Sequence, residues 1–556
     1  MMRLVLSLIV ALSAGSFVFA QQKPLPELDR VGVDMNKQRP LSLRDALSMA
    51  LDNNKDIEVA RENVRIAEFN LLGAQGVYDP RLSTAAFYER VKTPISSFLA
   101  AGQDGAIVQS GYTGSMRFEG ETPFLGGNYR VDFTSERSST NNLFTALSPL
   151  YPTALTFSYT QPLWRGMKVD NNRRQIQIAR KNLSLTDSQF RQRAIDTITN
   201  VQRAYWDLVF ALRSLQVQRD AVDVARTQLN HNKRLVQEGQ LAPIDVVASE
   251  AQISTYEQNV FAALEEVSRS ENNLKSLVAE NQKADIWSES IVPVDPIDLA
   301  VPQVSLPEAL KTAMENRPEL QQSEVQREIN QIDQKYFRDQ TKPAVDLVGT
   351  YGITGLAGSL SADESPFVSS NLLVRQRVDQ LSLLAGLDPL PVVPPTTISP
   401  DLLGGFGQSV ENLLTNRFSN FKFGVQISLP LRNRTAEANL GRSLVEGERI
   451  STQREQLEQT IQVDVRNALQ SMRSSEARLR AAIATREANE QQFASEQRKL
   501  DAGQSTVFLV LERQTALTEA RALELKAQTD LNKAIADLQR ATGNALRVNS
   551  IVVRVR

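Results

Sequence analysis

Cysteine is missing from all 556 residues of the chain. Without a thiol there can be no disulfide, no cysteine-ligated metal, no thiol nucleophile and no thiol-linked lipid anchor. Histidine is almost as scarce, because His231 is the only one. A single imidazole without cysteine cannot build a typical zinc site, so His231 is interpreted as a solvated helix residue and no metal is expected.

Long apolar runs are missing beyond the N-terminus. Residues 1–20 place Arg3 before an apolar run and end in a small residue, Ala20, which predicts a cleavable signal peptide and a mature chain that begins at Gln21. After that point no stretch approaches the roughly 20 apolar residues that a helix needs to cross a bilayer. If the chain enters a membrane, it must therefore do so as β-strands.

Neither sign of charge dominates, since 62 lysines and arginines face 64 acidic residues. This balance gives no broad basic field, so no nucleic-acid partner is expected. The sequence also lacks a phosphate-binding loop that ends in Lys-Ser or Lys-Thr and a Gly-x-Ser-x-Gly elbow. Many carboxylates precede a cation by three or four residues, as Glu496 precedes Lys499, which is typical of helix-surface charges. We therefore expect neither an enzyme nor a cofactor.

The chain contains the same plan twice. Leu41 to Leu47 (LSLRDAL) reappears as Val304 to Leu310 (VSLPEAL), and Gly239-Gln240 reappears as Gly503-Gln504. Ser42 and Ser305 each precede an acid by three residues, which predicts a capped helix start in both copies. A repeat this long is not a short-period solenoid. We interpret the chain as a tandem duplication of one large unit.

The expected domains follow from this duplication. Residues 1–20 form the signal peptide, 21–40 an N-terminal extension, 41–303 the first repeat and 304–556 the second repeat. Each repeat is expected to run from helices through strands into a long helical hairpin. In the first repeat the strands are expected at about 81–163, the hairpin at about 170–281 and an equatorial segment at 282–303. In the second repeat the strands are expected at about 344–430, the hairpin at about 434–543 and a C-terminal tail at 544–556.

The hairpin segments have the clearest periodicity. Apolar residues step by alternating threes and fours, as in Ile198, Val201, Tyr205, Leu208, Leu212 and Leu215. Such heptads pack as coiled coils. With only 6% aromatic residues, the composition also favours long exposed helices over compact cores. The arm from 171 to 237 would reach roughly 100 Å at 1.5 Å per residue, so it must line something long.

The strand segments alternate between apolar and polar residues, for example over 419–430. This pattern suits a barrel with lipid outside and water inside, although a half-buried sheet in a soluble sandwich stays an alternative. Strands at equivalent places in the two repeats are expected at 81–91, 153–163, 344–353 and 419–430. Four strands cannot close a barrel, because barrels begin near eight strands, so several chains must contribute.

Two further segments complicate the strand regions. A hairpin over 112–120 and 128–137 has no settled placement, and its entry into the wall would give each chain six strands. Residues 354–417 contain several prolines and little periodicity, which predicts a long loop on the extracellular side that partly plugs or shields the mouth.

The duplicated halves, the strand end Tyr159 to Trp164 and the helix arms that meet at Gly239 and Gly503 together resemble the TolC-like outer-membrane efflux protein family. The resemblance covers about residues 41–544. It implies an α+β membrane protein in which a homotrimer shares a transmembrane β-barrel in the outer membrane lipid. It also implies a long antiparallel coiled-coil helical barrel that crosses the periplasm to a periplasmic adaptor (membrane fusion) protein and an inner-membrane pump. The implied function is that of a passive outer-membrane channel in a tripartite export system.

The resemblance also assigns roles to the turns of the two hairpins. Asp245 and Glu512 match acidic positions at the periplasmic aperture, and three copies of each would make acidic rings that favour cations. The residues Gly239, Leu241, Gly503 and Ser505 match helix turns where the adaptor docks. An acid near a helix start also complements the helix dipole, and a glycine at a helix end needs no partner, so both plain structural roles stay alternatives.

The chain departs from the family pattern after its second turn glycine. Well-known members carry an arginine and a further aspartate there, whereas this chain has Ser505 and Leu509. A salt-bridge latch of the usual composition is therefore not expected, and the gating mechanism is open.

A periplasmic coiled-coil scaffold or adaptor without a pore is the alternative function. It would explain the heptads and the signal peptide, but it would not need the apolar ribbon over 421–429. Heat-modifiable trimers that only detergent extracts would favour the channel, and release by osmotic shock would favour the scaffold. The sequence does not distinguish small-molecule cargo from protein cargo, because the partner pump largely selects the cargo.

Overall fold

The computed structural model describes residues 30–95, 105–142, 144–297, 300–361, 366–391 and 398–551. The expected signal peptide, residues 21–29 of the expected N-terminal extension and residues 552–556 of the expected C-terminal tail lie outside these residues. The chain divides into two compact units. The first unit comprises residues up to 58, 193–316 and 461–554, and the second comprises 59–192 and 317–460.

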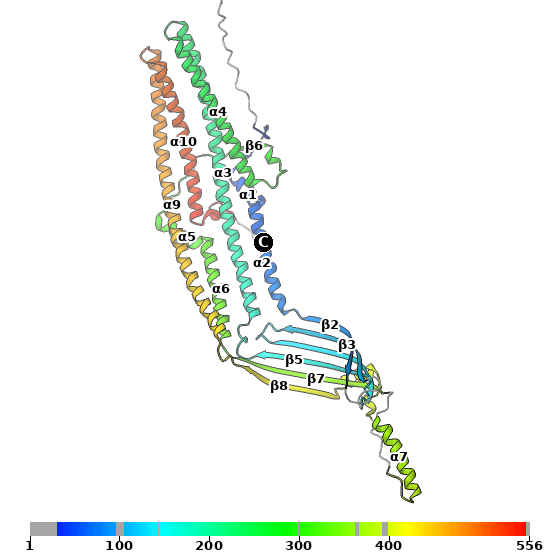
Figure 1. The fold of residues 1–556 in the computed structure, drawn as a ribbon. Helices are drawn as coiled ribbons and strands as arrows, with labels where there is room; N and C mark the ends of the chain where they lie inside the picture. The colour runs from blue at the N-terminus through cyan, green and yellow to red at the C-terminus, as the bar shows by residue number, and fades with distance from the viewer. Residues whose placement is uncertain are drawn as a thin grey trace, which may run out of the picture. The chain divides into compact units, whose positions relative to one another are not determined.

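Long helices dominate the first unit (Figure 1). Helix α3 (Asn171–Gln237) turns back into α4 (Pro243–Val278), and α9 (Arg434–Asp501) turns back into α10 (Val507–Ala541). Helices α3 and α9 have 67 and 68 residues and contribute to both units. The shorter helices of this unit are α1 (Leu43–Asn53), α5 (Leu306–Asn316) and α11 (Ala545–Val548).

Both predicted helix starts are confirmed. The Ser42 hydroxyl accepts a hydrogen bond from the Asp45 backbone N–H at 3.1 Å and donates one to the Asp45 carboxylate at 2.6 Å. The Ser305 hydroxyl accepts a longer bond, 3.4 Å, from the Glu308 backbone N–H. Each hydroxyl satisfies a donor that the helix geometry leaves free in the first turn.

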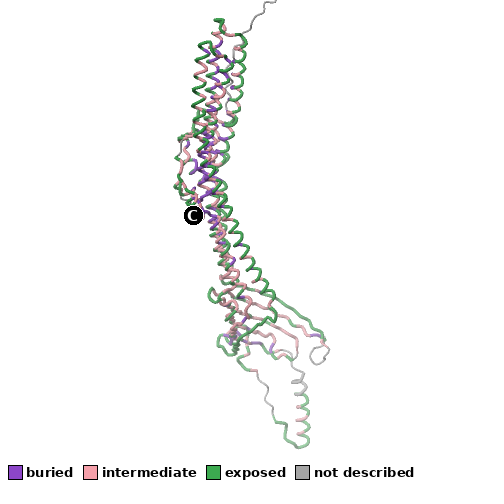
Figure 2. The backbone as a smooth tube through the Cα atoms, turned by 90° about the vertical axis from the view of Figure 1, so that its left-hand side faces the viewer, coloured by how far each residue is buried: buried purple, intermediate pink, exposed green. Residues whose placement is uncertain are grey.

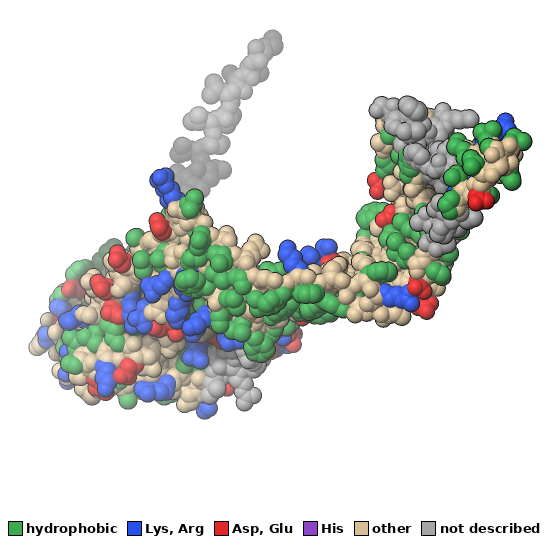
Figure 3. All heavy atoms as spheres, turned by 90° about the horizontal axis from the view of Figure 1, so that it is seen from below, with side chains coloured by type: hydrophobic (Ala, Val, Ile, Leu, Met, Phe, Trp, Pro, Cys, Tyr) green, Lys and Arg blue, Asp and Glu red, His purple; other side chains and the backbone are tan. Residues whose placement is uncertain are grey.

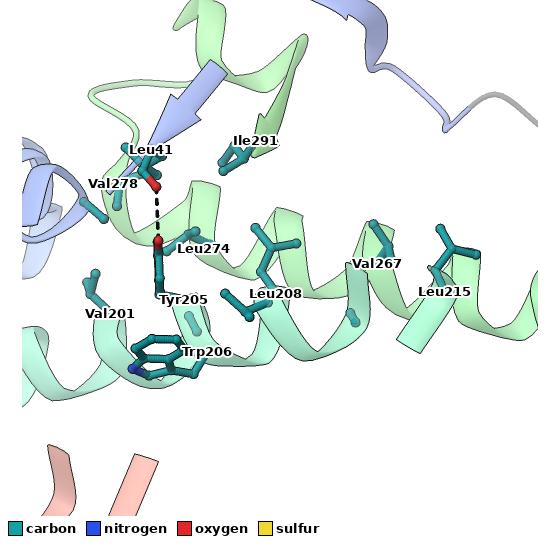
Figure 4. Packing of buried hydrophobic residues seen from close by; sticks show 14 of the residues in the cluster. Leu41, Val201, Tyr205, Trp206, Leu208, Leu215, Val267, Leu274, Val278 and Ile291 are labelled. Carbon is teal, nitrogen blue, oxygen red and sulfur yellow. Dashed lines mark hydrogen bonds between the residues drawn. The ribbon is translucent and has the colours of Figure 1, made fainter. Parts of the chain in front are cut away.

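The core of the first unit follows the heptad residues of α3 and α4 (Figure 4). Tyr205 and Trp206 are fully buried, with ring centroids 5.4 Å apart in an edge-to-face arrangement. The Tyr205 hydroxyl donates to the Leu41 carbonyl oxygen at 3.1 Å, and so ties α3 to the segment that precedes α1. Figure 2 shows the buried residues as a line along these helices rather than as one compact centre. The heptad pattern therefore identified the residues that are buried between these helices.

A small parallel sheet in the first unit was not expected from the sequence. Strand β1 (Asp34–Leu41) pairs with β6 (Glu289–Pro293), with Leu41 opposite Pro293. The first strand lies in the expected N-terminal extension and the second in the expected equatorial segment. The two segments are far apart in the sequence, so local periodicity could not reveal their pairing.

Within the residues that the structure describes, the second unit contains one antiparallel sheet of six strands. Its strands are β2 (Arg81–Pro94), β3 (Ala106–Glu121), β4 (Asn128–Thr140), β5 (Leu147–Pro162), β7 (Ala344–Leu360) and β8 (Phe418–Ser428). The strand order is β2-β3-β4-β5-β7-β8 (Figure 1). The hairpin of unsettled placement, β3–β4, is thus part of the sheet and separates β2 from β5. Helices α2 (Lys55–Gln75) and α6 (Pro318–Gln340) precede β2 and β7.

The interpretation of residues 354–417 as a loop without structure was wrong. Strand β7 continues to Leu360, and two helices follow, α7 (Pro366–Leu384) and α8 (Phe406–Leu414). The prolines misled the prediction because they stand where helices tolerate them or between the helices. Pro366 occupies the first position of α7, and Pro391 and Pro400 lie outside both helices.

None of the helices within the described residues is long and apolar enough to cross a membrane.

Candidate functional site

The sheet of the second unit has one apolar face. Because paired residues of antiparallel strands point to the same side, the register defines rows that cross all six strands. One such row consists of Leu82, Phe118, Val131, Phe157, Tyr351 and Phe421. We call the side that bears this row the apolar face.

Apolar side chains on this face are exposed in the single chain. Phe421 is 84% exposed and Phe423 is 72% exposed, although both belong to the largest apolar residue types. Figure 3, which views the molecule from below, shows hydrophobic side chains gathered in the middle of the picture. A contiguous exposed apolar surface of this kind marks a site that contacts lipid or another protein.

The opposite face of the sheet is polar. The row next to the one above consists of Arg81, Glu119, Arg130, Ser158, Thr350 and Lys422. Asp132 accepts from Arg117 Nε at 2.6 Å and lies 2.8 Å from Arg130 Nε, so it joins charges on two neighbouring strands. We call this side the polar face. A sheet with one apolar and one charged face is suited to separate a lipid phase from water.

The outermost strands of this sheet are β2 and β8, and among the described residues each pairs on one side only. Strand β2 has 14 residues and β8 has 11, and both are almost entirely exposed. An open strand edge presents a row of unpaired N–H and C=O groups that can pair with another chain. The two edges therefore offer complementary surfaces at opposite ends of one sheet.

The turns of the two helical hairpins, in the first unit, have the same backbone design. Gly239 and Gly503 have φ values of +75° and +69°. The N–H of the residue after each glycine bonds a carbonyl five residues earlier, namely Gln240 to Leu235 and Gln504 to Lys499, both at 2.8 Å. This is the Schellman helix ending, and its left-handed residue favours glycine.

The two hairpin turns also contact each other. Leu241, from the first turn, packs against a buried apolar cluster of the second hairpin formed by Leu500, Val507, Val510 and Leu511. His231 Nε2 lies 3.2 Å from Asp501 Oδ1 and so links α3 to the end of α9. Leu241 is thus a packing residue of the paired turns, whatever else it contacts.

The two predicted aperture acids lie just beyond these turns. Asp245 is in the first turn of α4, and Glu512 is an exposed residue of α10. In the part of the chain that the structure describes, neither carboxylate forms an ion pair. Neither acid is therefore committed to a cation within the described part of the chain.

Ser505 has a partner that the sequence did not indicate. Its hydroxyl donates to the Glu496 carboxylate, which also lies 3.1 Å from Lys499 Nζ. The hydrogen bond from Ser505 and, to a smaller extent, the one from Lys499 lower the pKa of the Glu496 carboxyl group. Since Glu496 lies in α9 and Ser505 lies nine residues later in the turn that follows it, no helical spacing rule predicts this contact.

Three buried charges connect α4 to the small sheet of the first unit. Arg30 Nη1 lies 2.7 Å from Glu271 Oε2, and Lys275 Nζ lies 3.6 Å from Glu271 Oε1. The other Glu271 interaction is a 2.7 Å hydrogen bond from the Ile291 backbone N–H, while Lys275 donates to the Glu289 carbonyl at 2.6 Å. Burial lowers the pKa of Lys275 despite the neighbouring Glu271. Because every partner is part of the fold, we interpret this cluster as structural.

Potential metal ligands do not gather within the described residues, which contain no group of three or more His, Asp or Glu side chains placed to hold an ion. A cavity of about 850 Å³ lies in the first unit between α3, α4 and the small sheet. Its lining is mostly apolar, with Val209, Val260 and Ile291 among the contributors.

Comparison with known proteins identifies a family. Residues 123–280 and 400–544 match the family described as outer membrane efflux protein, which is more than half of the chain. No curated protein matches the sequence.

Solved structures of similar fold include outer-membrane channels. The Campylobacter jejuni CmeC outer membrane channel has 15% sequence identity and a TM-score of 0.59, over 90% of this chain and 86% of that one. The open state of the Neisseria gonorrhoeae MtrE outer membrane channel has 16% identity and a TM-score of 0.58, over 91% and 89%. The outer-membrane channel OprN has 15% identity and a TM-score of 0.59, over 92% and 94%. The fold with long helices and strands, predicted from the sequence, is confirmed.

Proposed function

This chain belongs to the outer membrane efflux protein family, and from that premise we propose that it is the channel subunit of a tripartite export system. Its place is the outer membrane, with extension into the periplasm. In the proposed function, a pump and an adaptor deliver cargo to the helical hairpins, and the channel conducts the cargo passively to the exterior. The chain itself performs no catalysis.

The two-faced sheet is the observation that carries the proposal. Burying Phe421, Phe423 and their apolar neighbours in lipid would release about 25 cal/mol for each Å² removed from water. The charges of the polar face, such as Arg117 and Asp132, would remain hydrated in a lumen. Lipid on one side and water on the other satisfies both faces at once.

The open strand edges indicate how the sheet would be completed. Unpaired backbone groups are not tolerated in hydrocarbon, so an open sheet cannot stand alone in a bilayer. We propose that β2 of one copy pairs with β8 of the next, and that three copies close the wall as a homotrimer. This arrangement leaves no edge.

The hairpin turns would form the periplasmic end of the channel. We propose that Asp245 and Glu512 from three copies line the aperture as acidic rings, and that Gly239, Leu241, Gly503 and Ser505 form the surface on which the adaptor docks. The support for docking is geometric, because a side chain added at either glycine would meet open space rather than the chain's own atoms.

Conductance across a planar lipid bilayer tests the channel function. Purified protein should insert and give discrete, long-lived current steps. A coiled-coil scaffold without a pore would give none, and protein that never produces steps would contradict the proposal.

The acidic aperture predicts a change in ion preference. Replacing Glu512 by Ala should reduce the cation selectivity of these steps, because three carboxylates leave the narrowest ring. Glu265→Ala is the control, since Glu265 is an exposed acid in the middle of α4 that pairs with Arg269. Unchanged current and unchanged cation selectivity in the Glu512 variant would contradict the proposal that Glu512 lines the aperture.

A further inference from the structure

The hairpin β3–β4 has no counterpart among the described residues of the second half of the duplicated chain. In the first half, β2 and β5 enclose two additional strands. In the second half, the equivalent strands β7 and β8 enclose the helices α7 and α8 instead, and β7 pairs directly with β8. The two halves therefore differ by one inserted pair of strands.

The inserted strands continue the two faces of the sheet without a break. The row that contains Ala85 and Thr354 passes through Ser115 and Thr134 on the polar side. On the apolar side, the neighbouring row passes through Met116 and Phe133. The strands β3 and β4 thus pair with β2 and β5 in the same antiparallel manner as the other strands of the sheet pair with each other.

The turn of the hairpin is fastened to the rest of the second unit. Gln161 Nε2 donates to the Leu125 carbonyl at 2.8 Å, and Asn172 at the start of α3 donates to the Glu121 carboxylate. Gly126 has a φ of +68°, and a Cβ atom placed on it would lie 2.8 Å from the Gly166 carbonyl oxygen. Only glycine allows the backbone at Gly126 to approach the Gly166 carbonyl this closely, so the turn has a fixed position beside the start of α3.

We propose that β3–β4 is an inserted part of the channel wall that sets its width. This inference rests on the proposed trimeric channel. Three copies of a six-stranded sheet close with eighteen strands, whereas copies without the hairpin would close with twelve. At a strand spacing near 4.8 Å and a tilt near 40°, the backbone cylinder is about 36 Å across with eighteen strands and about 24 Å with twelve.

The difference in width decides what the outer part of the channel can hold. Side chains on the inner face reduce the bore by about 10 Å, which leaves about 26 Å with the hairpin and about 14 Å without it. An α-helix with its side chains is 10–12 Å in diameter. The wider wall therefore admits helical polypeptide segments with water around them as well as small molecules.

Cysteine labelling can test the placement of the hairpin, because the natural chain has no cysteine. Single cysteines are introduced on the polar face as Ser115→Cys and Thr134→Cys and on the apolar face as Met116→Cys and Phe133→Cys. The matched pair on β7, from the same two rows, is Thr354→Cys and Ile353→Cys. The protein is reconstituted in phosphatidylcholine vesicles and exposed to a water-soluble thiol reagent.

If the hairpin is part of the wall, the labelling rate should alternate between the polar-face and apolar-face cysteines both on the hairpin and on β7. The polar-face cysteines should react about tenfold faster than the apolar-face cysteines or more, because hydrocarbon excludes both the charged thiolate and the water-soluble reagent. Equally fast labelling at Met116, Phe133, Ser115 and Thr134, with alternation kept on β7, would place the hairpin in water and overturn this inference alone. Loss of alternation on β7 as well would overturn the proposed channel together with it.

Discussion

At the scale of single residues, three buried charges form one cluster within the described part of the first unit. Arg30, Glu271 and Lys275 have side chains that are 6%, 0% and 0% exposed. Glu271 is the shared partner, since it faces both cations and also accepts the Ile291 backbone N–H. Removing the shared anion leaves two cations buried together.

Replacing Glu271 by Gln should therefore destabilise the first unit by about 3–5 kcal/mol, which is typical of a broken buried ion pair. The shift should appear in the midpoint of the helical circular-dichroism melt. Lys275→Met should cost less, because burial already opposes the lysine charge and Arg30 still pairs with Glu271. Glu265→Gln, at an exposed pair on the same helix, should shift the midpoint little. Equal shifts for the Glu271 and Glu265 variants would show that the cluster has no special role.

Gly503 allows the docking proposal to be separated from backbone strain. Asparagine tolerates a positive φ better than other side chains, and the space around Gly503 is open, so Gly503→Asn should fold and assemble normally. We expect it to lose export in cells while its single-channel conductance stays unchanged, because the added side chain obstructs close approach of the adaptor.

The control for this variant is Gly386→Asn. Gly386 has a similar φ of +71° and similar open space, but it lies after α7 in the second unit. Cells with the control should export normally. Full export by the Gly503 variant would contradict docking at this turn.

Residue-level roles were only partly readable from the sequence. The positive φ of Gly239 and Gly503 was predictable, because glycine follows a helical run at both places. The hydrogen bond between Ser505 and Glu496 was not predictable, since it depends on how the turn folds back. The aperture and docking roles remain proposals, because they depend on additional copies and on partners.

At the scale of elements, β8 is the most exposed strand of the sheet. All of its residues are exposed, and its apolar and polar side chains alternate strictly from Phe421 to Ile427. If the apolar face contacts lipid, a charged side chain introduced on the apolar face of β8 should impair assembly, whereas one introduced on the polar face should not.

Phe423→Lys should impair assembly, because a lysine on the lipid face costs about 2–4 kcal/mol near the middle of the bilayer. Gln426→Lys, on the polar face of the same strand, should be tolerated in a water-filled lumen. The fraction of heat-modifiable trimer in outer-membrane extracts measures both effects. Equal loss in the two variants would contradict the assignment of the faces.

Elements with their own periodicity were predictable, and elements without it were not. The heptads of α3 and α4 predicted the buried line of Val201, Tyr205 and Leu208. The sequence of β1 has no alternation of apolar and polar residues, and its stability comes from a partner about 250 positions away. Helix α7 was missed because its leucines do not form one consistent apolar stripe and prolines follow it closely.

At the scale of the whole molecule, the barrel should still close without the hairpin β3–β4, but its diameter should be smaller. Deleting it would place β2 beside β5 in the antiparallel sense, with Leu82 and Phe157 in the same row. Trimers should still assemble, and electron microscopy of the particles should show a barrel narrowed by about one third. A barrel of unchanged width would show that the hairpin does not belong to the wall.

In the proposed channel, the apolar face and the open edges of the sheet are satisfied only in a closed assembly within lipid. Native mass spectrometry of the detergent-extracted protein measures whether this assembly forms. We expect one species with three times the mass of the mature chain, and no protein in the fraction released without detergent. A monomer that stays soluble in detergent-free buffer would contradict it.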